Sequence, residues 1–363
     1  MRKNKIELIA GVVLLVVSIL LLALANKVDG FAQWYSVVIY DALVSVIARI
    51  FGIFPFSVVE ILLYCVITAC IILIGRFIVK FIRNIINKKS NRKMIANYAS
   101  GFFVAASALF LVYVTNCGVN YHRDSFSESS GIELEPYTIE ELVEICQIMT
   151  EKVNQYANLV SRDDQGVMRL TEDVQSVARD TMINLATQYP ELEGYYPQPK
   201  GLLVSWILSV QQVSGIYSPF TIEANVNSGM VDYNIPFTAC HELSHLRGFM
   251  QEQEANFIAY LACDRSDSVE FQYSGSMLGW IYCMNELYEE KYEAWYEIRV
   301  ELDPVVENDL QLNREFWAKY ESKISEAADA WNDTYLKANG QEEGVKSYDR
   351  MVNLIIDYHR EMV

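Results

Sequence analysis

Three long apolar segments in the first third of the chain are the strongest constraint on its fold. They cover residues 9–25, 58–79 and 98–117. Each is close to the roughly 20 apolar residues that a helix needs to cross a bilayer. The sequence therefore predicts three transmembrane helices, and the 363 residues leave room for a second folding unit after them.

A fourth apolar segment, residues 35–54, contains two charges, Asp41 and Arg49. With three spans, the basic N-terminus (1–5) and the basic loop 83–93 both lie in the cytoplasm, whereas four spans would put that loop outside. The positive-inside rule thus favours three spans, with 35–54 as an interfacial or re-entrant helix. The alternative is a fourth span whose two charges pair inside the bundle.

The charge of the chain changes sign near residue 117. Residues 1–117 hold 12 Lys and Arg against 4 Asp and Glu, and the remainder holds 17 against 42. This division predicts a membrane anchor (1–117) that contacts the lipid bilayer, followed by a soluble domain (118–363). Three spans put that domain on the outer side of the cytoplasmic membrane. Its net charge of −25 argues against nucleic acid as a partner, because it would repel phosphates.

Helical patterns dominate the soluble domain. Thr138 and Glu141 have the spacing of a capping box, which predicts a helix start. Further helical periodicity covers 171–187, 269–299, 306–335 and 346–361. The best strand candidate is 214–227, which Gly and Pro bound. The predicted fold is mainly α, with N-terminal transmembrane helices and a mostly helical α+β soluble domain.

The segment "CHELSHLRGFMQEQEANFIAYLAC" (240–263) contains the pattern His-Glu-x-x-His at residues 241–245. On a helix His241 and His245 lie one above the other and can share a zinc ion, while Glu242 can take a proton from a zinc-activated water. Two of the four histidines of the chain fall here. The alternative interpretation is two surface histidines on an amphipathic helix.

A catalytic zinc site needs a third protein ligand, and Glu252 and Glu254 both follow the motif. In an unbroken helix Glu252 would lie about 10 Å beyond His245, at 1.5 Å per residue. The chain must therefore turn back, and Gly248 is suited to that turn before a second helix begins near Gln251. The two glutamates are two residues apart on that helix, so only one can face the zinc.

The pattern Glu252-Gln-Glu-Ala-Asn256 resembles that of the glutamate zincins, which include thermolysin-like enzymes and integral-membrane prenyl proteases. The resemblance implies a zincin-like domain with one Zn²⁺ per chain, held by His241, His245 and Glu252. It also implies that Asn256 supports a ligand histidine. These families have Asp at that position, and an amide supplies no negative charge there. The link between the two helices is also shorter than in those families.

A wider resemblance covers most of the chain. It is to an uncharacterised bacterial membrane-protein family, catalogued as a domain of unknown function and suspected of zinc-dependent peptidase activity. The segments that carry it, besides the three apolar spans, are "NYHR", "SPFTIEANVN", "PFTACHELSHLRGFMQEQEANFIAYLAC", "FQYSGSM" and "YLKANG" with "GVKSYDRMVNLI". The resemblance implies a family and no substrate.

A peptidase also needs a donor for the oxyanion and a strand that binds the substrate backbone. The candidates for the donor by residue type are Tyr273, Tyr348, His359 and His122. The segment 221–227 is a candidate edge strand.

These features together predict a membrane-anchored zinc metallopeptidase that hydrolyses peptides or proteins, with Glu242 as the general base. The alternative is a non-catalytic zinc-binding sensor or scaffold. Glu242 argues against that alternative, because a purely structural site needs no base beside its first ligand. Neither the substrate nor the oligomeric state follows from the sequence.

Overall fold

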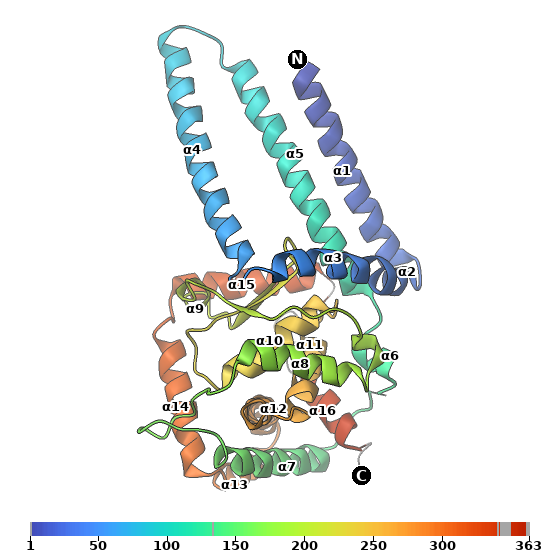
Figure 1. Cartoon of the computed structure of the whole chain (residues 1–363), viewed down its shortest axis with the longest axis vertical. Helices are drawn as coiled ribbons and strands as arrows, with labels where there is room; N and C mark the ends of the chain where they lie inside the picture. The colour runs from blue at the N-terminus through green and yellow to red at the C-terminus, as the bar shows by residue number, and fades with distance from the viewer. Residues whose placement is uncertain (1, 133, 340, 342–349, 361–363) are drawn as a thin grey trace.

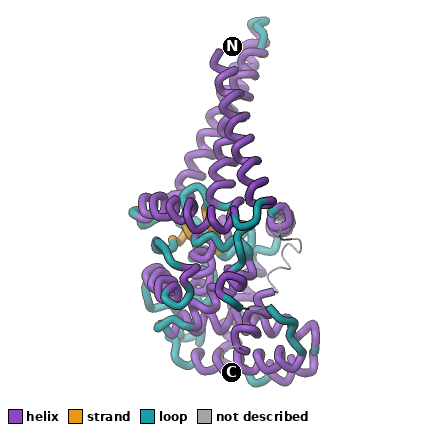
Figure 2. Tube along the Cα trace, turned by 90° about the vertical axis from the view of Figure 1, so that its right-hand side faces the viewer, coloured by secondary structure: helices purple, strands orange, loops and turns teal. Residues whose placement is uncertain are grey.

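The computed structural model describes residues 2–132, 134–339, 341 and 350–360. Most of these residues are helical, and the strands found among them form one small sheet. The predicted mainly α fold is therefore confirmed. Long helices project from one end of a globular part (Figures 1 and 2).

The three projecting helices are α1 (Arg2–Lys27), α4 (Val58–Ile86) and α5 (Arg92–Asn116), and they contain the three predicted apolar segments. The N-terminus and the α4–α5 connection lie at the same end, away from the globular part (Figure 1). Among the residues that the structure describes, four helices are long and apolar enough to cross a membrane: these three and the helical run Phe31–Gly52. The chain is thus suited to association with a bilayer.

The run Phe31–Gly52 lies crosswise between the projecting helices and the globular part (Figure 1). It consists of α2 (Phe31–Trp34), the π-helical η1 (Tyr35–Tyr40) and α3 (Asp41–Gly52); we call it the crosswise helix. Both of its charges face the globular part. Asp41 pairs with Arg247 at 2.8 Å, and the guanidinium of Arg49 lies 4.1 Å from the centre of the Tyr195 ring.

Two buried carboxylates fasten the start of α4 to the globular part. Glu60 accepts hydrogen bonds of 2.8 and 2.9 Å from the backbone N–H groups of Leu203 and Val204. Glu223 accepts from the first two N–H groups of α4 and also pairs with the buried Lys200. A fragment cut at residue 117 would lose these contacts, so experiments require the full chain.

The helices of the globular part surround a central pair, α10 (Asn234–Leu246) and α11 (Glu252–Asp264), which pack on each other and against α8 and α12. The others are η2 (Gly118–His122), α6 (Phe126–Ser130), α7 (Ile139–Ala157), α8 (Val174–Ala186), η3 (Pro190–Leu192), α9 (Trp206–Ser209), α12 (Val269–Glu290), α13 (Tyr292–Arg299), α14 (Pro304–Ala318), α15 (Lys323–Ala338) and α16 (Met351–Arg360). The capping box predicted at Thr138 and Glu141 is present at the start of α7.

Two of the predicted helices are divided. The pattern over 269–299 forms α12 and α13, which meet at Lys291, where the backbone leaves the helical region. The pattern over 306–335 forms α14 and α15, because the Ser322 side chain accepts hydrogen bonds from the N–H groups of Ile324 and Ser325 and starts a new helix.

The strand candidate 214–227 forms a hairpin. Its strands are β2 (Gly215–Ser218) and β3 (Glu223–Val226), paired antiparallel with Gly215 opposite Val226. A short β1 (Lys200–Gly201) pairs parallel with β3, which gives the order β1-β3-β2. The expectation that 221–227 is an edge strand is therefore wrong. β3 is the central strand and β2 is an edge strand, and both lie against α10.

Candidate metal centre

The turn between α10 and α11 brings the two ends of the motif together. Gly248 has φ +94°, its N–H donates to His245 O, and the N–H of Phe249 donates to Ser244 O. This is a Schellman motif, which favours glycine at its left-handed position. Helix α11 then begins at Glu252. The predicted turn at Gly248 is confirmed.

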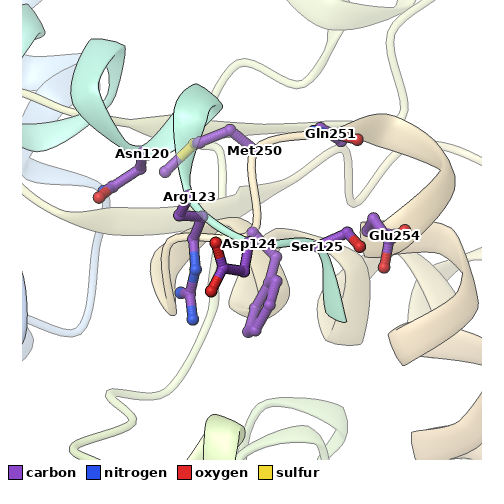
Figure 3. A pocket seen from close by; sticks show the side chains of 8 residues that line it. Asn120, Arg123, Asp124, Ser125, Met250, Gln251 and Glu254 are labelled. Carbon is purple, nitrogen blue, oxygen red and sulfur yellow. The ribbon is translucent and has the colours of Figure 1, made fainter. Parts of the chain in front are cut away.

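Two side chains from outside the helix pair hold this turn. The Tyr40 hydroxyl donates to Leu246 O at 2.9 Å, and Arg123 donates to Arg247 O at 3.0 Å, so two terminal carbonyls of α10 gain partners. The Arg123 guanidinium also lies 3.9 Å from the centre of the Phe249 ring. Figure 3 shows Arg123 lining a small hollow beside the turn. None of the three candidate zinc ligands lines it.

The side chains of His241, His245 and Glu252 converge. Their ligand atoms lie within 4.8 Å of one another. Glu252 Oε2 lies 3.3 Å from His241 Nε2 and 3.6 Å from His245 Nε2. Zinc ligands at 2.0–2.1 Å in a tetrahedral arrangement lie about 3.4 Å apart. The three residues therefore fit a zinc ion.

Hydrogen bonds and charges orient His245 and Glu252. His245 Nδ1 lies 2.8 Å from Phe249 O, so a proton on Nδ1 leaves the Nε2 lone pair free for a metal. Burial alone would lower the pKa of His245, but the nearby Glu252 carboxylate raises that pKa to about 9. Burial alone would raise the pKa of Glu252, but His245 and His241 hold that pKa well below its usual range.

Glu242 lies beside this group and is 3% exposed. Its Oε2 is buried and has no hydrogen-bond partner. Burial raises the pKa of Glu242 to about 7, against the opposing effect of the two histidines. Strand β2 passes so close that a Cβ on Gly215 would lie 2.5 Å from Glu242 Oε1. Glu242 is thus confined between β2 and the two histidines.

Glu254, the alternative ligand, faces another element. Its carboxylate accepts hydrogen bonds from the backbone N–H and the hydroxyl of Ser127, both at 3.1 Å, near the start of α6. Burial raises the pKa of Glu254. Figure 3 shows it beside Ser125 at the edge of the hollow. Its contacts are those of an anchor for α6.

Asn256 is buried but is not bonded to a candidate ligand. Its side-chain amide donates to the Tyr282 hydroxyl at 3.4 Å. Asn256 was expected to support a ligand histidine, but His245 Nδ1 lies 2.8 Å from Phe249 O, and His241 Nδ1 is buried and has no hydrogen-bond partner. The expected contact between Asn256 and a histidine is therefore absent from the described residues.

Two of the donor candidates named from the sequence, Tyr273 and His359, are bonded to other side chains. Tyr273 donates to Asp309 and accepts from Arg162, so it belongs to a buried network that joins α12 to α14. His359 lies 3.1 Å from the Tyr260 hydroxyl, and burial lowers the pKa of His359 to about 4. Burial also lowers the pKa of the half-buried His122. Tyr348 lies outside the described residues.

The charge of Glu252 acts on a tyrosine that the sequence did not single out. Burial raises the pKa of Tyr121 well above its usual value, and the charges of Cys117 and Glu252 add to the effect. Its hydroxyl donates to the Tyr335 hydroxyl at 3.3 Å. No local pattern marks Tyr121, because η2 and the start of α11 are far apart in the sequence and only the tertiary fold brings the charge of Glu252 to bear on Tyr121.

The comparisons with known proteins agree with the extent of this fold. A family model described as "Protein of unknown function (DUF3810)" matches residues 35–356. The chain belongs to the DUF3810 family. No curated protein and no solved structure matches it. The expected relation to an uncharacterised family is thus confirmed. The DUF3810 match runs from η1 to α16, so it includes most of the crosswise helix together with the globular part.

Proposed function

We propose that this DUF3810 protein is a membrane-anchored, zinc-dependent metallopeptidase of the zincin type. The observation that carries the proposal is the convergence of His241 Nε2, His245 Nε2 and Glu252 Oε2 beside the buried carboxylate of Glu242. Three protein ligands and a neighbouring base are typical of catalytic zinc sites. A structural site usually has four protein ligands and needs no base.

Zinc in such a site supplies a Lewis acid that polarises a carbonyl and lowers the pKa of water. The residues of the chain orient the group, balance its charge and transfer the proton. His245 is oriented by Phe249 O, and Glu252 balances the charge of the group. Glu242 accepts the proton from the attacking water and delivers it to the leaving amine. Its buried position keeps bulk water from competing for that proton.

The free edge of β2 is suited to bind the peptide. Among the described residues β2 pairs with β3 alone, so its other edge can pair with an extended chain. Gly215 brings β2 against Glu242, and the backbone of Tyr217 on the same strand donates a hydrogen bond to Glu242. Tyr121 replaces Tyr273 as the candidate donor to the oxyanion, because the charge of Glu252 acts on its hydroxyl. To donate there, the Tyr121 hydroxyl would have to leave the Tyr335 hydroxyl.

The proposed topology has three spans, α1, α4 and α5, in the cytoplasmic membrane. The basic residues of the N-terminus and of the α4–α5 connection lie at one end of these helices, and the globular part lies at the other (Figure 1). The positive-inside rule assigns the basic end to the cytoplasm and the catalytic part to the outer side. The inward-facing charges of the crosswise helix support an interfacial position for it.

The experiment that tests the function compares the wild-type full chain with E242Q, both loaded with zinc, on a peptide library. The proposal requires cleavage by the wild type and loss of cleavage in the variant. Zinc binding without any cleavage by the wild type would favour the sensor or scaffold alternative.

The G215A variant should retain its zinc and lose activity. The added Cβ would lie 2.5 Å from Glu242 Oε1 and 2.7 Å from Thr238 Cγ2, so β2 or Glu242 must move. Displacement of a catalytic group by about 1 Å can cost about 10²-fold in rate, and we expect a kcat lower by that order. Turnover of a fluorogenic peptide measures it.

The matched control is G229A, where an added Cβ would meet its nearest atoms at 3.4 Å, an ordinary contact. Its zinc content, melting temperature and kcat should equal those of the wild type. Full activity in G215A would show that Glu242 does not depend on the position of β2.

A further inference from the structure

Exposed tryptophans occur on three elements that are far apart in the sequence. Trp34 on α2 is 52% exposed, Trp206 on α9 is 61% exposed and Trp331 on α15 is 75% exposed. All three elements lie in the layer where the projecting helices meet the globular part (Figure 1). Trp295 lies on α13, at the opposite end of the globular part (Figure 1).

The same layer exposes large aliphatic side chains. The most exposed include Ile53 (77%), Leu203 (66%), Ile324 (60%), Val46 (58%), Val37 (57%) and Ile50 (53%). On the crosswise helix the polarity is the reverse of that of a helix on a soluble protein, because its charges face the protein and its apolar side chains face outward. Soluble monomers rarely expose contiguous apolar patches larger than a few hundred Å².

This apolar surface is continuous with the start or end of the proposed spans. Leu203 is bonded to Glu60 in the first turn of α4. Helix α15 reaches α5, where the Tyr113 hydroxyl donates to the Asn339 side chain at 2.6 Å and lies 3.4 Å from the Tyr335 hydroxyl. The surface therefore continues the lipid-facing sides of α4 and α5. A bilayer that surrounds those helices would also cover it.

We propose that Trp34, Trp206 and Trp331 form a belt that sets this face of the globular part into the interface of the bilayer. Tryptophan is enriched at this level of membrane proteins because its ring is amphipathic. The aliphatic side chains beside the belt then contact the acyl boundary instead of water.

If the belt lies at the bilayer interface, it also determines the class of substrate that reaches the metal centre. This inference rests on the function proposed above. Tyr40 of the crosswise helix bonds to Leu246 O, next to His245, and its hydroxyl lies 2.8 Å from that of Tyr217 on β2. The metal centre and the peptide-binding edge thus lie directly under a helix at the lipid surface. The substrates are polypeptides anchored in the same bilayer, cleaved a few residues from their anchor.

The belt is tested with the full chain in nanodiscs of phosphatidylethanolamine and phosphatidylglycerol. Lipids brominated near the headgroup should quench the tryptophan fluorescence. Because three tryptophans form the belt, W206F and W331F should each remove about a third of the quenched signal. W295F, at the far end, should remove none of it. Quenching that stays unchanged in W206F and W331F would overturn the belt. A second copy of the chain that shields Trp206 and Trp331 from the brominated lipids would also overturn it.

The substrate class is tested with one peptide attached to a lipid anchor through spacers of 5 or 30 residues. The effective concentration at a site on the lipid surface falls as the spacer lengthens, so the short spacer should give about tenfold faster cleavage. Cleavage about tenfold slower with the short spacer, or equal cleavage with both, would overturn the membrane-proximal substrate. No cleavage with either would overturn the peptidase function, and the quenching would still decide the belt.

Discussion

The E242Q variant is expected to bind zinc like the wild type and to hydrolyse peptides about 10²–10⁴-fold more slowly, the usual contribution of a general base. Glutamine has the shape of glutamate but cannot accept a proton from water at neutral pH. Among the described residues, no hydrogen bond joins Glu242 to Glu252 or to the ligand atoms of the histidines. The variant therefore breaks no contact of the ligands. The kcat for a fluorogenic peptide, with the zinc content of each sample, measures the effect.

The control for this experiment is E289Q, which changes the exposed Glu289 on α12 in the same way. It should leave both zinc content and kcat unchanged. An E242Q variant that keeps the wild-type rate would exclude Glu242 as the base and leave its buried carboxylate without a function.

The E252A and E254A variants should fail in different ways. Glu252 Oε2 lies 3.3 and 3.6 Å from the two histidine nitrogens, so E252A should remove a zinc ligand. Mutation of a residue that only supports a ligand lowers the metal affinity 10–100-fold, so loss of a ligand should lower the zinc affinity by more than about 10²-fold. E254A should keep the zinc. It leaves the buried N–H and hydroxyl of Ser127 without their acceptor, which should cost about 1–3 kcal/mol of stability.

Competition with a chromophoric chelator measures the zinc affinity, and thermal unfolding of the full chain in detergent measures the stability. Both variants remove a glutamate from the first turn of α11, so each serves as the control for the other. Loss of zinc in E254A with retention in E252A would reverse the ligand assignment.

Local sequence rules were enough to predict the helix and the turn that carry the metal centre. The spacing of His241 and His245 requires one helix face, and helix geometry requires a turn before Glu252 can return to them. Gly248 provides that turn with φ +94°. The spacing alone could not identify the third ligand, because it shows that only one of the two glutamates can face the zinc and does not say which one. The structure explains the assignment: α6 packs on the other side of α11, where Ser127 donates hydrogen bonds to Glu254.

Residues that depend on tertiary packing could not be predicted. Tyr273 has the right type for an oxyanion donor, but its hydroxyl is used by Asp309 and Arg162, whose approach no local pattern shows. Gly215 lies against Glu242 only because β2 packs on α10, and the charge of Glu252 acts on Tyr121 only because the fold brings η2 to that side of the molecule. The single strand expected at 214–227 became a hairpin, with Ile222 at φ +49° between its strands.

The central claim, that two histidines and one glutamate hold a zinc ion, is tested most directly by zinc-edge X-ray absorption of the purified full chain. The account predicts one zinc per chain, with nitrogen and oxygen neighbours at about 2.0–2.2 Å, a signature of two imidazoles and no sulfur. A zinc–sulfur shell near 2.3 Å, or a chain that binds no zinc at all, would contradict it.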